Sequence, residues 1–487
     1  MPRSIVIRVS GWCAGARAMA GVPNIFCISL DTKRMKKYLP FLLFAVAIAG
    51  CTTYKPAPLG TRPNATGDVA HIVVNTADMP LPELAAYPFD AGNGLDMTEV
   101  AMLAVANNPQ LKIARDGLGI SHAQAFAAGL LPDPQLGMTN DYLASTSVLG
   151  STSAFSLGIS YAVNGLLTRS AAKQAAQASE RQTDLNLLWQ EWQVVGQARL
   201  LFVRNVAQQK LLSLLQQQRA MLDARYEKTR QAASLGEVTL NAANLDLAML
   251  QNLETAINAL SRQINANQHD FNDLLGLTPD AQLQLVGDAD IPPLDEAKVA
   301  ADIAHLAQRR PDLRALEFGY ESQEQRFRQS VLAQFPALNI GFNRARDNFA
   351  TYTQGIGISM SLPIFNGNRG NVAIEQATRQ KLHDEYQLRI NTAVSEIGRI
   401  LQDQKLLEQQ LHNAESGVIA LELAANNAQA AFDAGNIDSQ MYSSLRTASL
   451  SKQAEAILIT QNLLEQRVAL LTLLGGKLPE IAPSETK

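Results

Sequence analysis

The sequence predicts an α+β membrane protein in which one structural unit occurs twice, each time in the order helix, strand, strand, long helix, helix. Three observations predict this class. Recognisable landmarks recur about 200 residues apart, three of four short strand-like segments alternate between apolar and small or polar residues, and residues 135–278 and 364–478 contain no proline. A period of two is typical of strands, and long proline-free stretches rich in Ala, Leu and Gln are typical of helices.

The beginning of the chain is typical of a bacterial lipoprotein. Lys36 and Lys37 precede an apolar run of about 11 residues, the size of a signal-peptide core and shorter than the roughly 20 residues of a membrane-spanning helix. The run ends in Ile48-Ala49-Gly50-Cys51, which resembles a lipobox. We therefore expect residues 35–50 to be a signal peptide, Cys51 to carry a covalent lipid, and residues 1–34 to be an upstream extension. The other interpretation is an ordinary cleaved signal in which the cysteine is incidental.

Composition excludes several functional classes. After residue 50 the chain keeps 34 Lys and Arg against 44 Asp and Glu, a formal charge of about −10, which argues against a nucleic-acid partner. Cys51 is then the only remaining cysteine, so no disulfide or thiolate metal site is expected. The six histidines form no close ligand pair, and no Ser/His/Asp array or phosphate-binding loop stands out. We expect no catalytic residue, no bound metal, no cofactor and no membrane-spanning helix after Cys51.

Matching landmarks relate the two units. The pairs are NNPQL at 107–111 with RRPDL at 309–313, LPDPQLGM at 131–138 with QFPALNIG at 334–341, and QAASLG at 231–236 with QAAFDAG at 429–435. A spacing near 200 is far longer than that of solenoid repeats and indicates a duplicated half-domain. The expected organisation is an N-terminal tether (51–96), a first repeat (97–277), a linker (278–297), a second repeat (298–476) and a C-terminal tail (477–487).

Each repeat is expected to contain the same elements. A first helix covers roughly 97–130 or 297–333, and two strands follow, at 135–146 with 152–163 or at 337–346 with 353–363. A long helix then covers about 166–232 or 367–432. At 1.5 Å per residue such a helix is about 100 Å long. A turn at Gly236 or Gly435 reverses it, and a second helix returns to about residue 276 or 474.

The strands distinguish two interpretations of a lipoprotein with long helices: a pore-forming barrel and a scaffold without a pore. Phe155, Leu157 and Ile159 alternate with Ser156 and Gly158, so one face suits lipid and the other suits a water-filled lumen. Strand edges cannot stay open in lipid, and four strands are too few for a barrel, so copies must combine; three copies give twelve strands. The alternative is an envelope scaffold with a periplasmic coiled coil and no pore.

On these residues the chain resembles the outer-membrane efflux protein family of TolC-like channels, especially the lipoprotein members that serve resistance-nodulation-division pumps. The resemblance depends on the duplicated order, on RRPDLRALE at 309–317, on LPIFNGNRG at 362–370 and on the lipobox. It implies a homotrimer with a 12-stranded β-barrel in the outer membrane, continued by a periplasmic α-helical barrel. It also implies docking with a periplasmic membrane-fusion adaptor and an inner-membrane efflux transporter, and lipid anchoring through Cys51. A type I secretion duct is the alternative within this class. The sequence does not identify the substrate.

Two glycines mark the most informative turns. Gly236 and Gly435 suit tight reversals because glycine accepts a positive φ, and the resemblance places both at the periplasmic tip where the adaptor docks. Repeated threefold, the acids beside them would form rings that favour cations; these are Glu237, Asp433 and Asp438. Phe432 is the candidate for an apolar constriction. The alternative interpretation is that the three acids are ordinary exposed turn residues. The family's tyrosine, arginine and aspartate gate is not expected, because Ala242, Ile437 and Met441 stand beside these turns.

Overall fold

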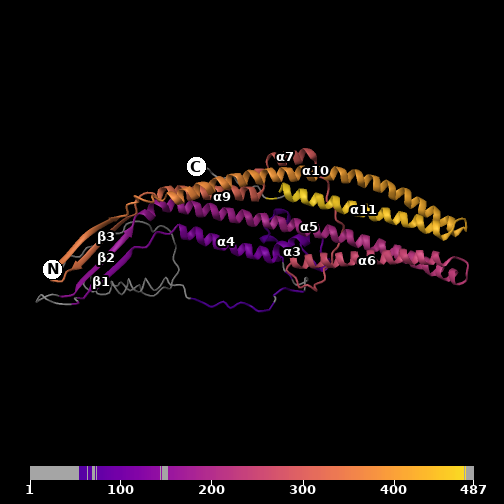
Figure 1. Cartoon of the computed structure of the whole chain (residues 1–487), viewed down its shortest axis with the longest axis horizontal. Helices are drawn as coiled ribbons and strands as arrows, with labels where there is room; N and C mark the ends of the chain where they lie inside the picture. Colours follow the sequence, from indigo (N-terminus) through magenta and orange to yellow (C-terminus); the bar gives the residue numbers. More distant parts are fainter. Residues whose placement is uncertain are drawn as a thin grey trace, which may run out of the picture. The chain divides into compact units, whose positions relative to one another are not determined.

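The computed structural model contains the predicted strand pairs and long helices (Figure 1). It describes residues 54–62, 64–67, 72, 74–142, 144, 152–475 and 478. The predicted extension, the signal peptide, Cys51 and all of the tail except Leu478 lie outside these residues. Residues 65–487 form one unit and residues 1–64 form another, and every contact given below lies within the former.

The four strands form one antiparallel sheet in the order β1-β2-β3-β4. They are β1 (Gln135–Asp141), β2 (Ala154–Ala162), β3 (Leu338–Arg346) and β4 (Tyr352–Met360). The β1 strand is shorter than the predicted 135–146. The β2 strand of the first repeat pairs with the β3 strand of the second, for example Ile159 with Phe342, so the repeats share one sheet.

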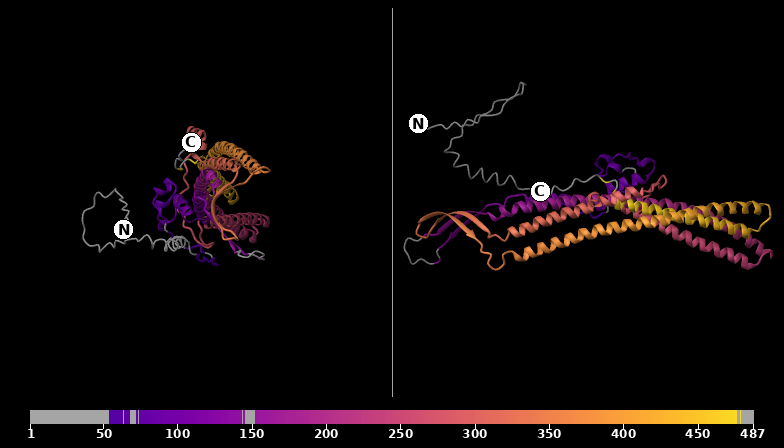
Figure 2. Two further views of the ribbon diagram at one scale, coloured as in Figure 1. Left: turned by 90° about the vertical axis from the view of Figure 1, so that its left-hand side faces the viewer. Right: turned by 90° about the horizontal axis from the view of Figure 1, so that it is seen from above.

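Four helices run away from the sheet and return. They are α5 (Asn164–Ser234) with α6 (Leu240–Leu274), and α10 (Arg369–Asp433) with α11 (Ser439–Leu474). The 71 residues of α5 correspond to about 105 Å. The sheet lies at one end of the long helices, and the turns that join α5 to α6 and α10 to α11 lie at the other (Figures 1 and 2).

The first helix of each repeat is broken, where the sequence predicted one continuous helix. The region 97–130 contains α3 (Met97–Asn107) and α4 (Pro109–Ala128), and the region 297–333 contains α7 (Glu296–Ala304), α8 (Leu306–Arg309) and α9 (Pro311–Leu332). Proline starts a helix well but forces the residue before it out of helical geometry. Asn108 and Arg310 accordingly have ψ of 124° and 121°.

Each of these two breaks lies next to the C-terminal end of another helix of the same repeat. Asn108 accepts a hydrogen bond from the Leu111 amide at 3.0 Å and donates one to the Leu274 carbonyl at 2.8 Å. It thereby caps the start of α4 and the end of α6 together. In the second repeat, Arg310 Nη1 donates to the Leu473 carbonyl near the end of α11 at 3.5 Å, while Arg310 Nη2 lies 2.7 Å from Asp312 Oδ2. The short helices α4 and α9 therefore start next to the C-terminal ends of α6 and α11.

The main core lies where these junctions meet the segment before residue 97. That segment contains η2 (Thr76–Asp78), α2 (Pro82–Ala85) and η3 (Ala91–Asn93). The buried side chains of this segment pack with those of α3, α5 and α6. Together these elements contribute Leu81, Leu84, Leu95, Met102, Trp192, Phe202 and Phe271 to the core. Three residues of the expected tether, Leu81, Leu84 and Leu95, are therefore part of this core.

One helix departs from the sequence expectation about membrane spans. Within the described residues, α11 (Ser439–Leu474) is long and apolar enough to cross a bilayer by length and composition alone. Core helices of soluble proteins meet the same criterion. Its packing against α10 and α5 places it in the helical body, since Leu450, Leu463, Val468 and Leu470 are buried there.

Candidate functional site

The two helix turns have the same backbone geometry. Gly236 and Gly435 have φ of 76° and 75°, in the left-handed region that glycine tolerates best. The amide after each glycine donates to the carbonyl five residues back, at 2.9 Å for Glu237 to Ala232 and 2.8 Å for Asn436 to Ala431. This is the Schellman arrangement that closes a helix C-terminus. The predicted turn glycines are therefore where the sequence placed them, at the same end of the long helices.

The predicted acidic residues lie on both turns and are exposed. Glu237 follows Gly236 on the first turn, and Asp433 and Asp438 flank Gly435 on the second. Asp438 caps α11, accepting a hydrogen bond from the Met441 amide at 2.7 Å. Asp433 accepts one from the Gln429 side chain at 2.9 Å. Both aspartates thus have local structural partners, while their carboxylates remain on the solvent-facing end of the helical body.

Phe432 is engaged within its own hairpin. Its ring stacks on that of Tyr442, with 5.4 Å between the centroids and 14° between the planes. Tyr442 was not identified from the sequence. The signal that could have found it is an aromatic residue four positions after the Asp438 cap, which the turn brings back opposite the last turn of α10. The stacked pair braces the second turn.

The first hairpin contains a buried ion pair instead. Arg225 Nη2 on α5 lies 2.8 Å from Asp246 Oδ1 on α6, and the Thr229 hydroxyl donates to Asp246 Oδ2 at 2.8 Å. Asp246 is only 1% exposed. Removing one partner of a buried pair leaves an uncompensated charge, so this contact holds α5 and α6 together close to the turn. Sequence reasoning missed it because the partners are 21 residues apart and meet only after the reversal.

The sheet has two chemically different faces. Along the rows set by the strand register, Leu136, Ile159, Phe342 and Ile356 are neighbours on one face. Gly137, Gly158, Gly341 and Gly357 stand on the other, with serine and asparagine beside them. The apolar face is open, since Leu136 is 74% and Ile356 77% exposed. An open apolar face backed by a small and polar one suits a wall between lipid and water.

Both the sheet and the helical body end in uncovered edges. Within the described residues, β1 and β4 each pair on one side only. In the helical body, α5 contacts α4, α6, α9 and α11, whereas α10 contacts α9 and α11. The helices α4 and α6 therefore lie on one side of this row and α10 on the other. Exposed apolar residues are found on both, including Ile113, Ile120, Leu240, Leu245, Leu388 and Leu406.

A charged cluster joins α4 to α5. Arg115 Nη2 lies 2.8 Å from Glu191 Oε1, and His122 Nδ1 lies 2.7 Å from Glu180 Oε1. Burial raises the pKa of Asp184, and the nearby Glu180 raises it further. Burial also raises the pKa of Glu191, against the opposing effect of Arg115. The cluster is a titratable contact between two helices.

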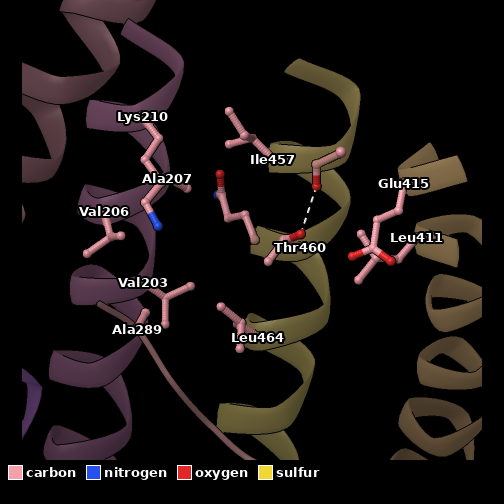
Figure 3. Close-up of a pocket in the computed structure, with 12 residues that line it drawn as sticks. Val203, Val206, Ala207, Lys210, Ala289, Leu411, Glu415, Ile457, Thr460 and Leu464 are labelled. Carbon is pink, nitrogen blue, oxygen red and sulfur yellow. Dashed lines mark hydrogen bonds between the residues drawn. The ribbon is translucent and has the colours of Figure 1, made fainter. Parts of the chain in front are cut away.

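A cavity of ≈ 230 Å³ lies between α5, α10 and α11 (Figure 3). Its lining is mostly aliphatic, with Val203 and Leu464 on facing helices and Lys210 and Glu415 as charged members. The Thr460 hydroxyl donates to the Ala456 carbonyl of its own helix at 2.8 Å. In the part of the chain that the structure describes, no group of three His, Cys, Asp or Glu could hold a metal. The cavity therefore has the chemistry of a packing groove.

Comparison with known proteins gives a consistent result. Residues 303–476 match the family model described as "Outer membrane efflux protein". Over 429 residues the chain is 23% identical to the multidrug resistance outer membrane protein MdtQ of Escherichia coli O157:H7, covering 78% of this chain and 85% of that protein.

Solved structures share the fold. A membrane protein from Pseudomonas aeruginosa aligns with a TM-score of 0.68 at 18% identity, covering 88% of this chain and 99% of the other. The Campylobacter jejuni CmeC outer membrane channel aligns with a TM-score of 0.66 at 16% identity, covering 89% and 95%.

A sheet with one apolar and one small, polar face, continued by two long helical hairpins, is the fold that this chain shares with the solved outer membrane channel. The family model matches the second repeat, and the shared fold covers both repeats. Residues 303–476 therefore carry an outer membrane efflux protein domain, and the chain is homologous to a multidrug resistance outer membrane protein over most of its length.

Proposed function

We propose that the chain is the outer-membrane channel of a tripartite efflux pump, which conducts substrates passively from the periplasm to the exterior. The open edges of the sheet carry this proposal. Among the described residues, nothing pairs with the outer sides of β1 and β4, whose N–H and C=O groups cannot remain unbonded in lipid. Antiparallel pairing of β4 with β1 of another copy satisfies both edges and continues the apolar face around a ring.

Three copies are the number that the strands favour. Two copies give an eight-stranded barrel, whose interior is just filled by side chains, whereas twelve strands leave a lumen. The same rotation brings α10 of one copy against α4 and α6 of the next, which covers the exposed apolar residues of both edges. The helical body then closes into a periplasmic barrel below the membrane.

The two turns are the proposed docking end. A periplasmic membrane-fusion adaptor would contact the turns at Gly236 and Gly435 and connect the channel to an inner-membrane efflux transporter, which supplies the energy. Glu237, Asp433 and Asp438, repeated threefold, would give this end an acidic mouth. A covalent lipid on Cys51 would anchor the assembly to the outer membrane.

Single-channel conductance in planar bilayers tests the proposal. The acylated protein is compared with a variant in which Glu237, Asp433 and Asp438 are alanine. The matched control replaces three exposed acids away from the turns, Asp116, Asp270 and Glu385, by alanine. We expect long-lived pores in all three proteins and reduced cation selectivity only in the turn variant.

The other outcomes separate the alternatives. If both variants form pores with the same selectivity, the channel proposal stands and the proposal of an acidic mouth is refuted. A folded wild-type protein that forms no pore supports the envelope scaffold. A pore that passes an unfolded polypeptide with an inner-membrane exporter supports a type I secretion duct.

A further inference from the structure

The apolar face of the sheet ends in two arginines at the edge remote from the helices. On β3, Arg344 and Arg346 follow Ile340 and Phe342 at every second position, so all four stand on the same face. Arg344 is level with Leu157 and Gln354, and Arg346 is level with Phe155 and Tyr352. The face thus changes from aliphatic to cationic over about 7 Å, the rise of two strand residues.

Neither arginine has an acidic partner in the described residues. Arg346 Nη2 donates to the Ser153 carbonyl at 2.8 Å, while its buried Nε finds no hydrogen-bond partner among the residues that the structure describes. The Arg344 guanidinium lies 6.0 Å from the centre of the Tyr352 ring. The adjacent segment 142–151 contains no Asp or Glu. The carboxylate of Asp347 accepts the amides of Phe349 and Thr351, at 2.9 and 2.8 Å.

A recess joins the two side chains. It has a volume of ≈ 430 Å³ and is lined by residues of all four strands or their ends, among them Asn140, Ser153, Arg344, Arg346 and Tyr352. Guanidinium groups, an amide, a hydroxyl and a phenol are all able to donate hydrogen bonds. A recess with many donors and no carboxylate is suited to an anion rich in acceptors.

We propose that this recess binds the phosphorylated headgroup of a lipid in the outer leaflet of the outer membrane. The inference depends on the proposed channel, because that function turns the apolar face toward lipid and puts Arg344 and Arg346 at headgroup level. An unpaired charge beside hydrocarbon is costly and needs a counter-ion. A phosphate can accept two parallel hydrogen bonds from a guanidinium, which a simple surface cation such as lysine cannot provide. The acyl chains of such a lipid would lie on Leu157, Ile159 and Phe342.

The test measures lipid binding to the full-length acylated protein by native mass spectrometry. The protein is reconstituted in phosphatidylcholine nanodiscs that contain either bisphosphorylated lipid A or its dephosphorylated form. Three proteins are compared: wild type, Arg344→Gln/Arg346→Gln, and a charge-matched control, Arg230→Gln/Arg262→Gln, with both substitutions on exposed helical arginines. A fourth protein, Arg344→Lys/Arg346→Lys, keeps both positive charges. It shows whether lost binding in the glutamine variant could come from misfolding alone.

We expect wild type and control to retain lipid A and to release the dephosphorylated form. The glutamine variant should bind lipid A about 30-fold more weakly, from a roughly fivefold effect per arginine at a membrane surface. The lysine variant should bind lipid A with an affinity between those of the wild type and the glutamine variant. The proposed headgroup site is refuted if the wild type retains both lipids equally. It is also refuted if the glutamine variant binds lipid A as tightly as the wild type does.

Conductance of the same samples separates this inference from the channel itself. Pores from every variant together with unchanged lipid binding overturn the lipid site and leave the channel standing. A wild-type protein that neither inserts nor conducts overturns both.

Discussion

The contact between α5 and α11 depends on a residue without a side chain. A Cβ atom at Gly196 would lie 2.6 Å from the Thr472 hydroxyl oxygen and 3.3 Å from its methyl carbon. A hydrogen bond joins the same two helices one turn away, since the Trp192 indole donates to the Thr472 carbonyl at 2.9 Å. Thr472 is short and branched, so it cannot turn away as a long side chain can. We therefore expect Gly196→Ala to push the two helices apart.

The magnitude follows from two opposing effects. Overpacking in a close helix contact costs about 1–3 kcal/mol, and alanine in place of a helical glycine returns about 1 kcal/mol. The single variant should lose up to about 2 kcal/mol of unfolding free energy. In a Thr472→Ala background the nearest remaining atom is the Cβ at 3.5 Å, which is ordinary contact, so Gly196→Ala should then stabilise by about 1 kcal/mol.

The assay is a double-mutant cycle on thermal unfolding in detergent, followed by circular dichroism at 222 nm at one protein concentration. The matched control is Gly319→Ala, where a Cβ would meet only the flexible end of Gln182. We expect a coupling of about 1–3 kcal/mol for the Gly196 and Thr472 pair. If Gly196→Ala stabilises equally in both backgrounds, the close approach of α5 and α11 is refuted.

Three further predictions concern the junction, a turn and the charged cluster. Asn108→Ala removes the cap of α4 and the bond to Leu274, so unfolding free energy should fall by about 1–2 kcal/mol, measured by denaturant titration, while Asn108→Asp should keep the cap alone. Gly435→Ala meets no atom within 4 Å but keeps a positive φ, so thermal unfolding should show a loss of about 1 kcal/mol and hydrogen exchange should localise it to the turn; an unchanged turn contradicts this. Because the pKa of Asp184 is raised in the folded state, its effect on stability is unfavourable above that pKa and is relieved as pH falls toward the unfolded value near 4. Asp184→Asn should therefore raise the unfolding temperature at pH 8 and not at pH 4, and an equal change at both would contradict the assignment.

Sequence periodicity was sufficient for the elements that depend on local chemistry. Alternation in the predicted runs 152–163 and 353–363 indicated β2 and β4, and the glycines at 236 and 435 predicted the turns. These features depend on the preferences of single residues, which a sequence displays directly.

The features that sequence reasoning missed require two distant residues to meet. The prolines at 109 and 311 were recognised as landmarks of the duplication, yet the helix breaks before them were not predicted. Tyr442 and the Arg225–Asp246 pair were missed for a related reason, since their partners lie across a helix reversal. The aliphatic pattern of β3 was visible, but the carboxylate-free surroundings of Arg344 depend on the register of its neighbours.

The two unpaired strand edges have a consequence for biogenesis. A newly secreted single chain would expose β1, β4 and the apolar face to the aqueous periplasm, and such edges are templates for unwanted pairing. It could not shelter in the bilayer alone, because its edges would be unbonded there. In the proposed channel, insertion and association would therefore occur as one concerted event, and the rate of maturation would rise steeply with the local density of chains. A lipid on Cys51 would raise that density by confining nascent subunits to a surface, so acylation would act as an assembly factor as well as an anchor.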